Sequence, residues 1–214
     1  MAEYTLGWCL WVTQRMEAFR EAQRQRVWRA LDPAPLHGRT LAIVGLGEIG
    51  RAIARAGRAL GMRVIGVSRR GRKVRGVTAM YRPSAIARAL GQADFVAVVL
   101  PLTEETRGLI GEAELRAMKA SAWLINIGRG AVVSEAALVR ALTAGQIAGA
   151  ILDVLDTEPL PPDHPLWALP NAVITPHIAG PSVPGEIAPV FNDNLRRYLA
   201  GRRLRFVVDR RRGY

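Results

Sequence analysis

The sequence predicts an α/β protein with a doubly wound parallel sheet. Between residues 40 and 180, short segments that are apolar at nearly every position alternate with amphipathic segments. Fully apolar strands are typical of parallel sheets that carry helices on both faces. A glycine-rich stretch, VGLGEIG at 44–50, joins the first apolar segment to the first amphipathic one. A strand, a glycine turn and a helix in this order are typical of the same fold class.

The chain is expected to begin with one long helix over residues 3–29. Four apolar residues recur at helical spacing and define one face: Trp8, Val12, Met16 and Phe19. The first third of this segment is apolar nearly all round, so this part of the helix needs burial on several sides. The segment 31–39, which two prolines interrupt, is expected to be a linker.

The alternating region gives six strands and four helices, and a further helix follows it. The expected strands are 40–45, 63–68, 94–100, 122–127, 148–154 and 172–176. The expected helices are 48–61, 83–92, 111–119, 134–145 and 187–201, with Ser134 as an N-cap and Gly145 as a C-terminal stop. We expect a single domain over 1–214, made of the N-terminal helix and linker (1–39), the sheet region (40–180), and a C-terminal helix with a basic tail (181–214).

The composition excludes several classes of protein. The net charge is +12, from 30 basic and 18 acidic residues. The arginines are spread along the whole chain without interleaved aromatic residues, so we expect no nucleic-acid partner. No apolar run reaches the roughly 18–20 residues of a membrane span, and the N-terminus does not have the pattern of a signal peptide. Cys9 is the only cysteine, so we expect no disulfide framework, no metal site and a cytoplasmic location.

The glycine-rich stretch predicts a Rossmann-type binding site for a dinucleotide. In this pattern Gly45 permits a tight turn, Gly47 lets a pyrophosphate approach the backbone, and Gly50 lets the helix pack closely on the strand. The amides of Glu48 and Ile49 lie at the start of the helix, where its dipole favours an anion. The alternative is a strand–turn–helix unit that needs its glycines only for packing.

The end of the second strand favours NADP over NAD. An acidic residue at this point would bind the adenosine ribose hydroxyls of NAD. Here the chain has Ser68, Arg69 and Arg70 instead, and a hydroxyl with two guanidinium groups suits a 2′-phosphate. The alternative is that both arginines are solvated and that the backbone alone holds the ribose.

Three further stretches follow predicted strands at the edge where ligands bind in such sheets. They are NIGRG at 126–130, LDVLDTEPLP at 152–161 and TPHIAG at 175–180. Together with the glycine loop and the stretch 93–119, they resemble the D-isomer-specific 2-hydroxyacid dehydrogenases. That family includes phosphoglycerate, glyoxylate/hydroxypyruvate and D-lactate enzymes and formate dehydrogenase. The resemblance runs from about residue 2 to residue 214.

The resemblance implies a role for each motif. Arg129 matches the arginine that clamps the substrate carboxylate, and His177 matches the general acid that protonates the carbonyl oxygen. Glu158 matches the carboxylate that holds this histidine and favours its protonated form, and Asp153 matches the residue that bonds the nicotinamide carboxamide. The remaining cofactor contacts are expected at Leu100, Pro101, Thr106, Ile127, Gly128, Ala179 and Gly180.

Each residue also has a plainer interpretation. A histidine after a proline is often only a loop residue, and an arginine between glycines is often part of a surface turn. The other two histidines, His37 and His164, match no family motif, and we expect both to be solvated.

The sequence departs from the family at its start, because the resemblance begins at the long helix and the family's N-terminal substrate domain is expected to be missing. One interpretation is an NADPH-linked reductase of a small 2-oxoacid such as glyoxylate or hydroxypyruvate, seen as a fragment or completed by another chain. The alternative is a dinucleotide-binding module or truncated fragment with little or no catalysis. A third, weaker alternative is a basic interaction protein that reuses the fold.

The family pairs through its nucleotide-binding domains, so we expect a homodimer that uses the apolar N-terminal helix. A helix folded back on its own chain would count against this argument. The C-terminal helix is expected to lack its usual packing partner and to be either mobile or docked on the partner subunit.

Overall fold

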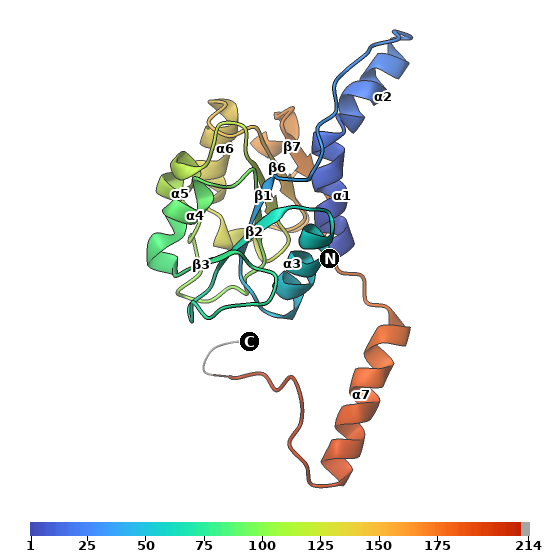
Figure 1. The fold of residues 1–214 in the computed structure, drawn as a ribbon, viewed down its shortest axis with the longest axis vertical. Coiled ribbons are helices and arrows are strands. Elements are labelled where there is room, and N and C mark those ends of the chain that lie inside the picture. The colour runs from blue at the N-terminus through green and yellow to red at the C-terminus, as the bar shows by residue number, and fades with distance from the viewer. Residues whose placement is uncertain (211–214) are drawn as a thin grey trace. The chain divides into compact units, whose positions relative to one another are not determined.

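A seven-stranded sheet forms the centre of residues 1–179 (Figure 1). The structure is a computed structural model that describes residues 1–210, and the chain divides into two compact units, Met1–Ala179 and Gly180–Tyr214. The strands are β1 (Thr40–Val44), β2 (Arg63–Val67), β3 (Ala79–Tyr81), β4 (Phe95–Val98), β5 (Trp123–Asn126), β6 (Gly149–Leu152) and β7 (Ala172–Ile174). All six pairings are parallel, in the order β3-β2-β1-β4-β5-β6-β7, which confirms the doubly wound α/β fold.

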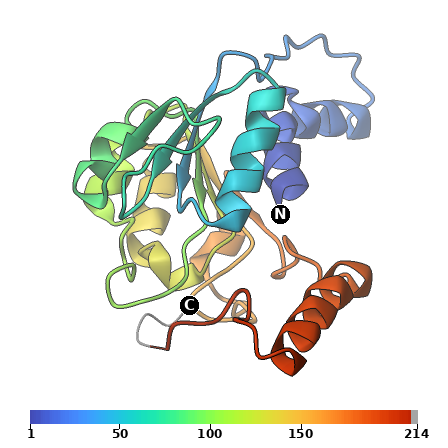
Figure 2. The ribbon, with the colours of Figure 1, turned by 60° about the horizontal axis from the view of Figure 1, so that its bottom comes forward.

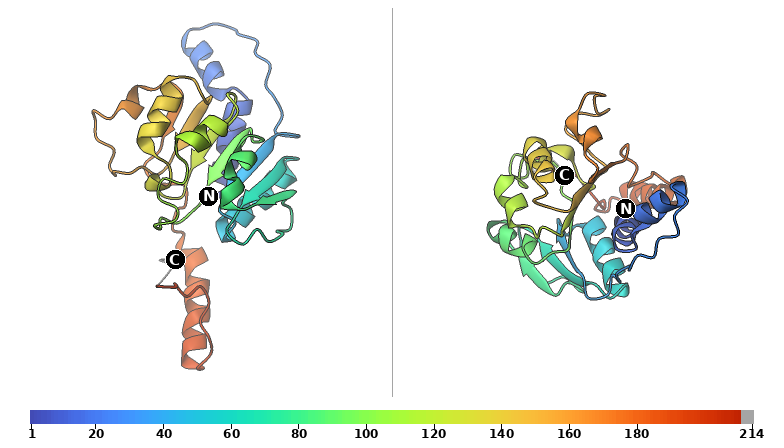
Figure 3. Two further views of the ribbon diagram at one scale, coloured as in Figure 1. Left: turned by 90° about the vertical axis from the view of Figure 1, so that its left-hand side faces the viewer. Right: turned by 90° about the horizontal axis from the view of Figure 1, so that it is seen from above.

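Helices cover both faces of the sheet. The helices of the first unit are α1 (Ala2–Thr13), α2 (Met16–Arg24), α3 (Glu48–Ala59), α4 (Ile86–Leu90), α5 (Glu112–Ala117) and α6 (Glu135–Thr143). Helix α7 (Pro184–Leu199) belongs to the second unit. Leu41 and Ile43 pack in the core with α1 and α3, whereas Ala42 and Val44 pack with α4, α5 and α6. This alternation within one strand gives three layers, which the right-hand view of Figure 3 shows along the sheet.

The sequence did not predict strand β3. Its three residues pair with β2 at the edge of the sheet, with Ile65 opposite Ala79. All three are only partly buried, because no further strand covers that side. A short edge strand therefore lacks the run of apolar residues that identified the other six.

The prediction of one long helix over 3–29 is wrong, because the segment forms α1 and α2. Arg15 between them has a φ of 53°, in the left-handed region. The carbonyl of Thr13 accepts the N–H of Ala34 at 2.9 Å, and the side chain of Gln14 donates to the Ala34 carbonyl at 3.0 Å. The linker thus takes the acceptor that a continuous helix would have used.

Helix α1 packs on its own chain, beside α3 (Figure 2). Leu6 and Cys9 are buried in the core between α1, α3 and the sheet. Trp11 is partly buried, with its ring centroid 6.1 Å from that of Trp123. The apolar surface of this helix is therefore largely covered without a second chain, which removes that argument for a dimer. The dimer itself stays a prediction.

The helix ends predicted from the sequence agree with the structure at α6 and differ more elsewhere. Ser134 lies at the N-cap of α6, although its side chain makes no capping hydrogen bond, and Gly145 has a φ of 63° just after the helix. Helix α7 begins at Pro184, three residues earlier than expected, and has no buried residue. Within the described part of the chain, no helix has the length and apolarity to cross a membrane.

Candidate cofactor and catalytic site

Glycines bring the loops after neighbouring strands into contact at the carboxyl edge of the sheet. Gly45 follows β1 with a φ of 109°, and a Cβ there would lie 2.6 Å from the carbonyl oxygen of Val99. Gly128 follows β5, and a Cβ there would lie 2.7 Å from the carbonyl oxygen of Leu100. Since real Cβ atoms do not approach so closely, no side chain fits at either position. The loops after β1, β4 and β5 therefore form one continuous rim.

The glycine loop is tightly packed at one glycine and open at another. A Cβ at Gly50 would lie 2.0 Å from the carbonyl oxygen of Gly45, so this glycine serves close packing within the protein. A Cβ at Gly47 would meet no atom within 4 Å, so this side of the loop is open. Helix α3 begins at Glu48 without a side-chain cap, and the first N–H groups of a helix have no partner inside it. These groups, including those of Glu48 and Ile49, fit a dinucleotide phosphate.

The end of β2 carries the predicted adenosine-binding residues. The guanidinium of Arg69 lies 3.1 Å from the carboxylate of Glu105, in the loop after β4, and both side chains are about half exposed or more. The carbonyl of Ser68 accepts a hydrogen bond from the N–H of Gly71, and this bond closes a turn that contains Arg69 and Arg70. Glu105 was not singled out from the sequence. A phosphate bound to Arg69 would have to compete with this carboxylate.

The loop after β4 is shaped by one of its own predicted residues. The hydroxyl of Thr106 donates to the carbonyl of Pro101 at 2.7 Å and accepts the N–H of Thr103 at 2.8 Å. This closes the loop that follows Leu100. Thr106 therefore fixes the shape of this loop through hydrogen bonds inside it.

The predicted acid–base pair is formed. Nδ1 of His177 lies 2.8 Å from one carboxylate oxygen of Glu158, and the other oxygen accepts the N–H of Leu155 at 3.0 Å. Burial raises the pKa of Glu158, but the hydrogen bonds from His177 and Leu155 outweigh it and hold the pKa below its ordinary value. Because Nδ1 faces the carboxylate, Nε2 is the ring nitrogen of His177 that does not contact Glu158.

Asp153 positions the loop that carries this histidine. Its buried carboxylate accepts the hydroxyl of Thr175 at 2.6 Å and the N–H groups of Ile178 at 2.9 Å and Ala179 at 2.8 Å. Its carbonyl accepts the N–H of His177, whose φ is 55°. Sequence reasoning expected Asp153 to contact the nicotinamide carboxamide, and it missed this internal role.

Helix α1 supports the same loop from the other side. The hydroxyl of Tyr4 lies 2.5 Å from the hydroxyl of Thr175, two residues before His177. Burial raises the pKa of Tyr4, which keeps the phenol neutral. No sequence pattern pointed to Tyr4, because its partner is 171 residues away.

The turn that carries Arg129 is held by Asn126 at the end of β5. The buried amide of Asn126 accepts the N–H of Gly128 and donates to the carbonyl of Arg129, both at 3.2 Å. Arg129 is exposed and donates to the Gly128 carbonyl at 2.7 Å. A Cβ at Gly130 would lie 2.0 Å from the carbonyl carbon of Leu155. The Arg129 turn is therefore in contact with the loop that leads to Glu158.

A hollow of about 510 Å³ lies beside the acid–base pair. Its lining is mainly apolar and comes from the end of β7 and from the loops after β6 and β7. The residues are Asp153, Leu155, Glu158, Pro159, Leu160, Trp167, Ile174, Thr175, Pro176 and His177.

His164 was expected to be solvated, but the structure places it in a network beside this hollow. Its side chain is only 21% exposed, with Nε2 2.9 Å from a carboxylate oxygen of Glu135. Nδ1 accepts the N–H of Leu166, and the second oxygen of Glu135 accepts the N–H of Asp156. Since Nδ1 accepts, Nε2 donates to Glu135. The network ties the Glu158 loop to the start of α6.

The remaining predicted residues divide between the two units. Ile127 and Ala179 are buried in the first unit. Gly180 begins the second unit, so it is not placed relative to the others. Among residues 1–210, no group of three or more histidine, cysteine, aspartate or glutamate side chains could hold a metal ion.

A parallel sheet with an open glycine loop at the start of α3 defines a Rossmann dinucleotide-binding domain. The model of the D-isomer specific 2-hydroxyacid dehydrogenase NAD-binding domain matches residues 6–179. The chain belongs to this family, and the predicted resemblance is confirmed. Members of the family act on small 2-hydroxyacids.

Curated relatives are named as reductases. Glyoxylate reductase of Aeropyrum pernix is 50% identical over 146 residues, which are 67% of this chain and 43% of the relative. Glyoxylate/hydroxypyruvate reductase A of Yersinia enterocolitica is 34% identical over 214 residues, which are 100% of this chain and 68% of the relative. The matched segments thus span about half to two thirds of these relatives.

Two solved structures share the fold across the whole chain. A D-isomer specific 2-hydroxyacid dehydrogenase from Xanthobacter autotrophicus Py2, in complex with NADPH and MES, has a TM-score of 0.92 at 39% identity. The match covers 100% of this chain and 88% of that one. An NADPH-dependent glyoxylate/hydroxypyruvate reductase from Sinorhizobium meliloti, in complex with NADP and sulfate, has a TM-score of 0.92 at 32% identity. The match covers 100% of this chain and 69% of that one.

Proposed function

We propose that the protein is the cofactor-binding and catalytic part of an NADPH-dependent reductase that acts on a small 2-oxoacid such as glyoxylate or hydroxypyruvate. The observation that carries this proposal is the His177–Glu158 pair at 2.8 Å, at the same edge of the sheet as the glycine loop. The contact between Gly130 and Leu155 links the Arg129 turn to this pair. The names of the relatives support the choice of substrate.

Each side chain has a distinct role in this proposal. The guanidinium of Arg129 binds the carboxylate of the oxoacid. His177 holds a proton at Nε2 and donates it to the carbonyl oxygen, while Glu158 accepts from Nδ1 and stabilises the protonated ring. Asp153 holds the His177 loop in place. The nicotinamide, when bound, supplies the hydride.

The test measures NADPH oxidation by these 214 residues with glyoxylate and with hydroxypyruvate. We expect dinucleotide binding with little turnover, because the matched segments span only 43% and 68% of two relatives and we propose that the remainder of such a protein orients the substrate. Orientation can account for about 7–11 kcal/mol of a barrier. Adding the part of a relative that lies outside the matched segment, as a separate chain, is expected to raise turnover. His177→Ala, which removes the proton donor together with its hydrogen bond to Glu158, serves as the control.

The outcome separates the two interpretations left open by the sequence. Turnover of about 1–10³ s⁻¹ that disappears in His177→Ala would mean that the short chain is a complete enzyme. Binding with no turnover, even with the added part, would favour the dinucleotide-binding module.

We also propose that NADPH binds more tightly than NADH. The absence of an acid at the end of β2, together with Ser68, Arg69 and Arg70, supports this preference. Arg69→Ala is expected to reduce the difference in affinity between NADPH and NADH. Glu105→Gln is expected to increase this difference, because it removes the carboxylate that pairs with Arg69. Calorimetry at one salt concentration gives both affinities. Equal affinities in the unmodified protein would contradict the preference.

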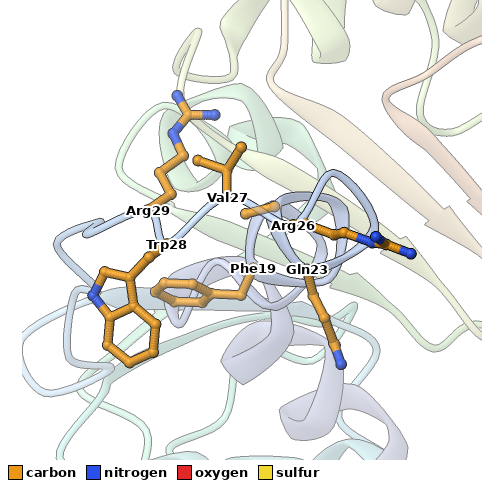
Figure 4. A pocket seen from close by; sticks show the side chains of 7 residues that line it. Phe19, Gln23, Arg26, Val27, Trp28 and Arg29 are labelled. Carbon is orange, nitrogen blue, oxygen red and sulfur yellow. The ribbon is translucent and has the colours of Figure 1, made fainter.

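We propose further that two copies of the chain pair through α2 and the segment after it. There Phe19, Val27 and Trp28 line a hollow of about 480 Å³, whose side chains Figure 4 shows. Trp28 is 99% exposed, and a fully exposed indole on a projecting segment favours a protein partner. Two-fold pairing is the commonest form of self-association.

Light scattering after size exclusion tests the pairing. We expect a dimer that Trp28→Ala weakens, while Leu60→Ala, at an exposed residue outside this surface, leaves it unchanged. A monomer at micromolar concentration would rule out the pairing.

A further inference from the structure

A strongly basic hollow of about 780 Å³ lies between α3 and the loop after β2. Neither the acid–base pair nor Ser68, Arg69 and Arg70 line it. Its lining residues are Arg51, Arg55, Arg58, Lys73, Val74, Arg75 and Gly76. Five of these seven are cationic, and no acidic residue of the described chain is among them.

The three arginines share the outer face of α3. Arg51, Arg55 and Arg58 are spaced by four and three residues and are exposed, whereas Ile53 and Ala54 of the same helix are buried in the core. The rise of an α-helix separates them by about 6 Å and about 4.5 Å along its axis. The helix therefore presents a row of guanidinium groups.

The loop after β2 supplies the opposite side of the hollow. Val74 and Val77 pack against the core cluster below α3, and they hold the loop against the helix. Lys73 and Arg75, on either side of Val74, are exposed. Gly76 has a φ of 87°, and a Cβ there would lie 3.8 Å from Cδ of Arg58. The packing of the Val74 and Val77 side chains therefore holds Lys73 and Arg75 opposite the arginines of α3, although these basic side chains all carry the same charge.

The charges in this hollow are poorly compensated. Of the five cations, Arg51 alone has an ion pair among residues 1–210, at 3.7 Å from Glu48, whose side chain is 79% exposed. Like charges at helical spacing repel each other, so the row on α3 weakens the helix in the absence of an anion. A concave surface lined by one sign of charge concentrates the opposite charge from solution.

We propose that this hollow binds a compact polyphosphate anion, separately from the dinucleotide. Guanidinium groups bind phosphate oxygens in pairs, and a row of them suits several linked phosphates. No aromatic side chain lines the hollow, so it offers no surface on which a nucleobase would stack. Its concave shape favours a short anion over a flat membrane surface.

Calorimetry with inorganic tripolyphosphate tests the proposal, first with the protein alone and then with saturating NADPH, at about 50 mM salt. We expect binding in both cases. Arg55→Ala/Arg58→Ala is expected to weaken it by about tenfold or more. The control Arg20→Ala/Arg88→Ala removes the same charge from two exposed arginines outside the hollow, and we expect a change of less than about twofold.

Three results would overturn the proposal. Equal weakening in the two double variants would mean that overall charge, not the hollow, attracts the anion. Loss of tripolyphosphate binding when NADPH is present would assign the anion to the cofactor's own phosphate site. Tighter binding of a single-stranded RNA oligonucleotide, weakened by the same Arg55→Ala/Arg58→Ala variant, would make nucleic acid the ligand. NADPH affinity, measured in parallel, is expected to be the same in both variants.

Discussion

The two units use similar helices in opposite ways. Helix α3 in the first unit and α7 in the second are both amphipathic, yet α3 has four buried residues and α7 has none. The apolar residues Ile187, Val190, Phe191 and Leu195 of α7 are all exposed. Most helical stability comes from packing of the apolar face rather than from intrinsic propensity. The first unit therefore carries the stability of the fold and, except for Gly180, all of the candidate site.

The largest effect is expected where backbone approaches backbone in the first unit. Gly50→Ala would place a Cβ 2.0 Å from the Gly45 carbonyl oxygen, and we expect a loss of about 4 kcal/mol or more in the free energy of unfolding. Gly47→Ala meets no atom within 4 Å, so it is expected to cost at most about 1 kcal/mol and yet to weaken NADPH binding. Urea unfolding measures both. Equal destabilisation would show that the two glycines serve the same purpose.

A matched pair of truncations compares the two helices directly. Ile53→Ala on α3 removes a fully buried side chain, and the resulting cavity is expected to cost about 3 kcal/mol. Phe191→Ala on α7 removes a larger side chain that is 64% exposed, and we expect less than about 0.5 kcal/mol. A comparable loss for Phe191→Ala would mean that a further surface covers α7 in solution.

A smaller effect is expected from the acid–base pair. His177→Ala removes the hydrogen bond that lowers the pKa of Glu158, so this pKa should rise, and carboxyl NMR can follow it. A depressed folded-state pKa stabilises the protein above the unfolded value of about 4.3 and stops doing so as pH falls through the folded value. The stability difference between the wild type and His177→Ala should therefore shrink below about pH 4. A constant difference would show that the pair contributes no ionic stabilisation.

The smallest effect is expected from removing α7 altogether. Deleting residues 184–214 is expected to change the free energy of unfolding of the first unit by less than about 1 kcal/mol, because α7 has no buried residue. Thermal and urea unfolding of the shortened chain would check this. A large loss would contradict the division of stability between the units.

Local sequence patterns predicted most of the fold because the strands and helices of this sheet are defined by short apolar segments. Six of the seven strands were found in this way, whereas β3 was missed. The break between α1 and α2 was also missed, because it depends on the contact of Ala34 with Thr13. Features that rest on distant partners leave no periodic signal in the sequence.

The same limit applies to the site. Glu158 and His177 lie in recognisable motifs, and the structure brings them together. The contact of Tyr4 with Thr175, which supports the His177 loop, spans 171 residues and belongs to no local motif. The same is true at the end of β2, where Arg69 meets Glu105 across 36 residues. The internal hydrogen bonds of Asp153 could have been suspected from an acid at the end of a fully apolar strand. His164 gave no such signal, because its partner Glu135 lies on another element.

The single thiol of the chain offers a way to watch the site open. Burial between α1 and α3 raises the pKa of Cys9 to about 12, so the thiolate is almost absent near neutral pH. A thiol reagent will modify Cys9 only when α1 leaves the sheet. The same helix carries Tyr4, which supports Thr175, two residues before His177. The rate at which the reagent labels Cys9 therefore measures how often α1 detaches and the His177 loop loses the contact of Tyr4 with Thr175.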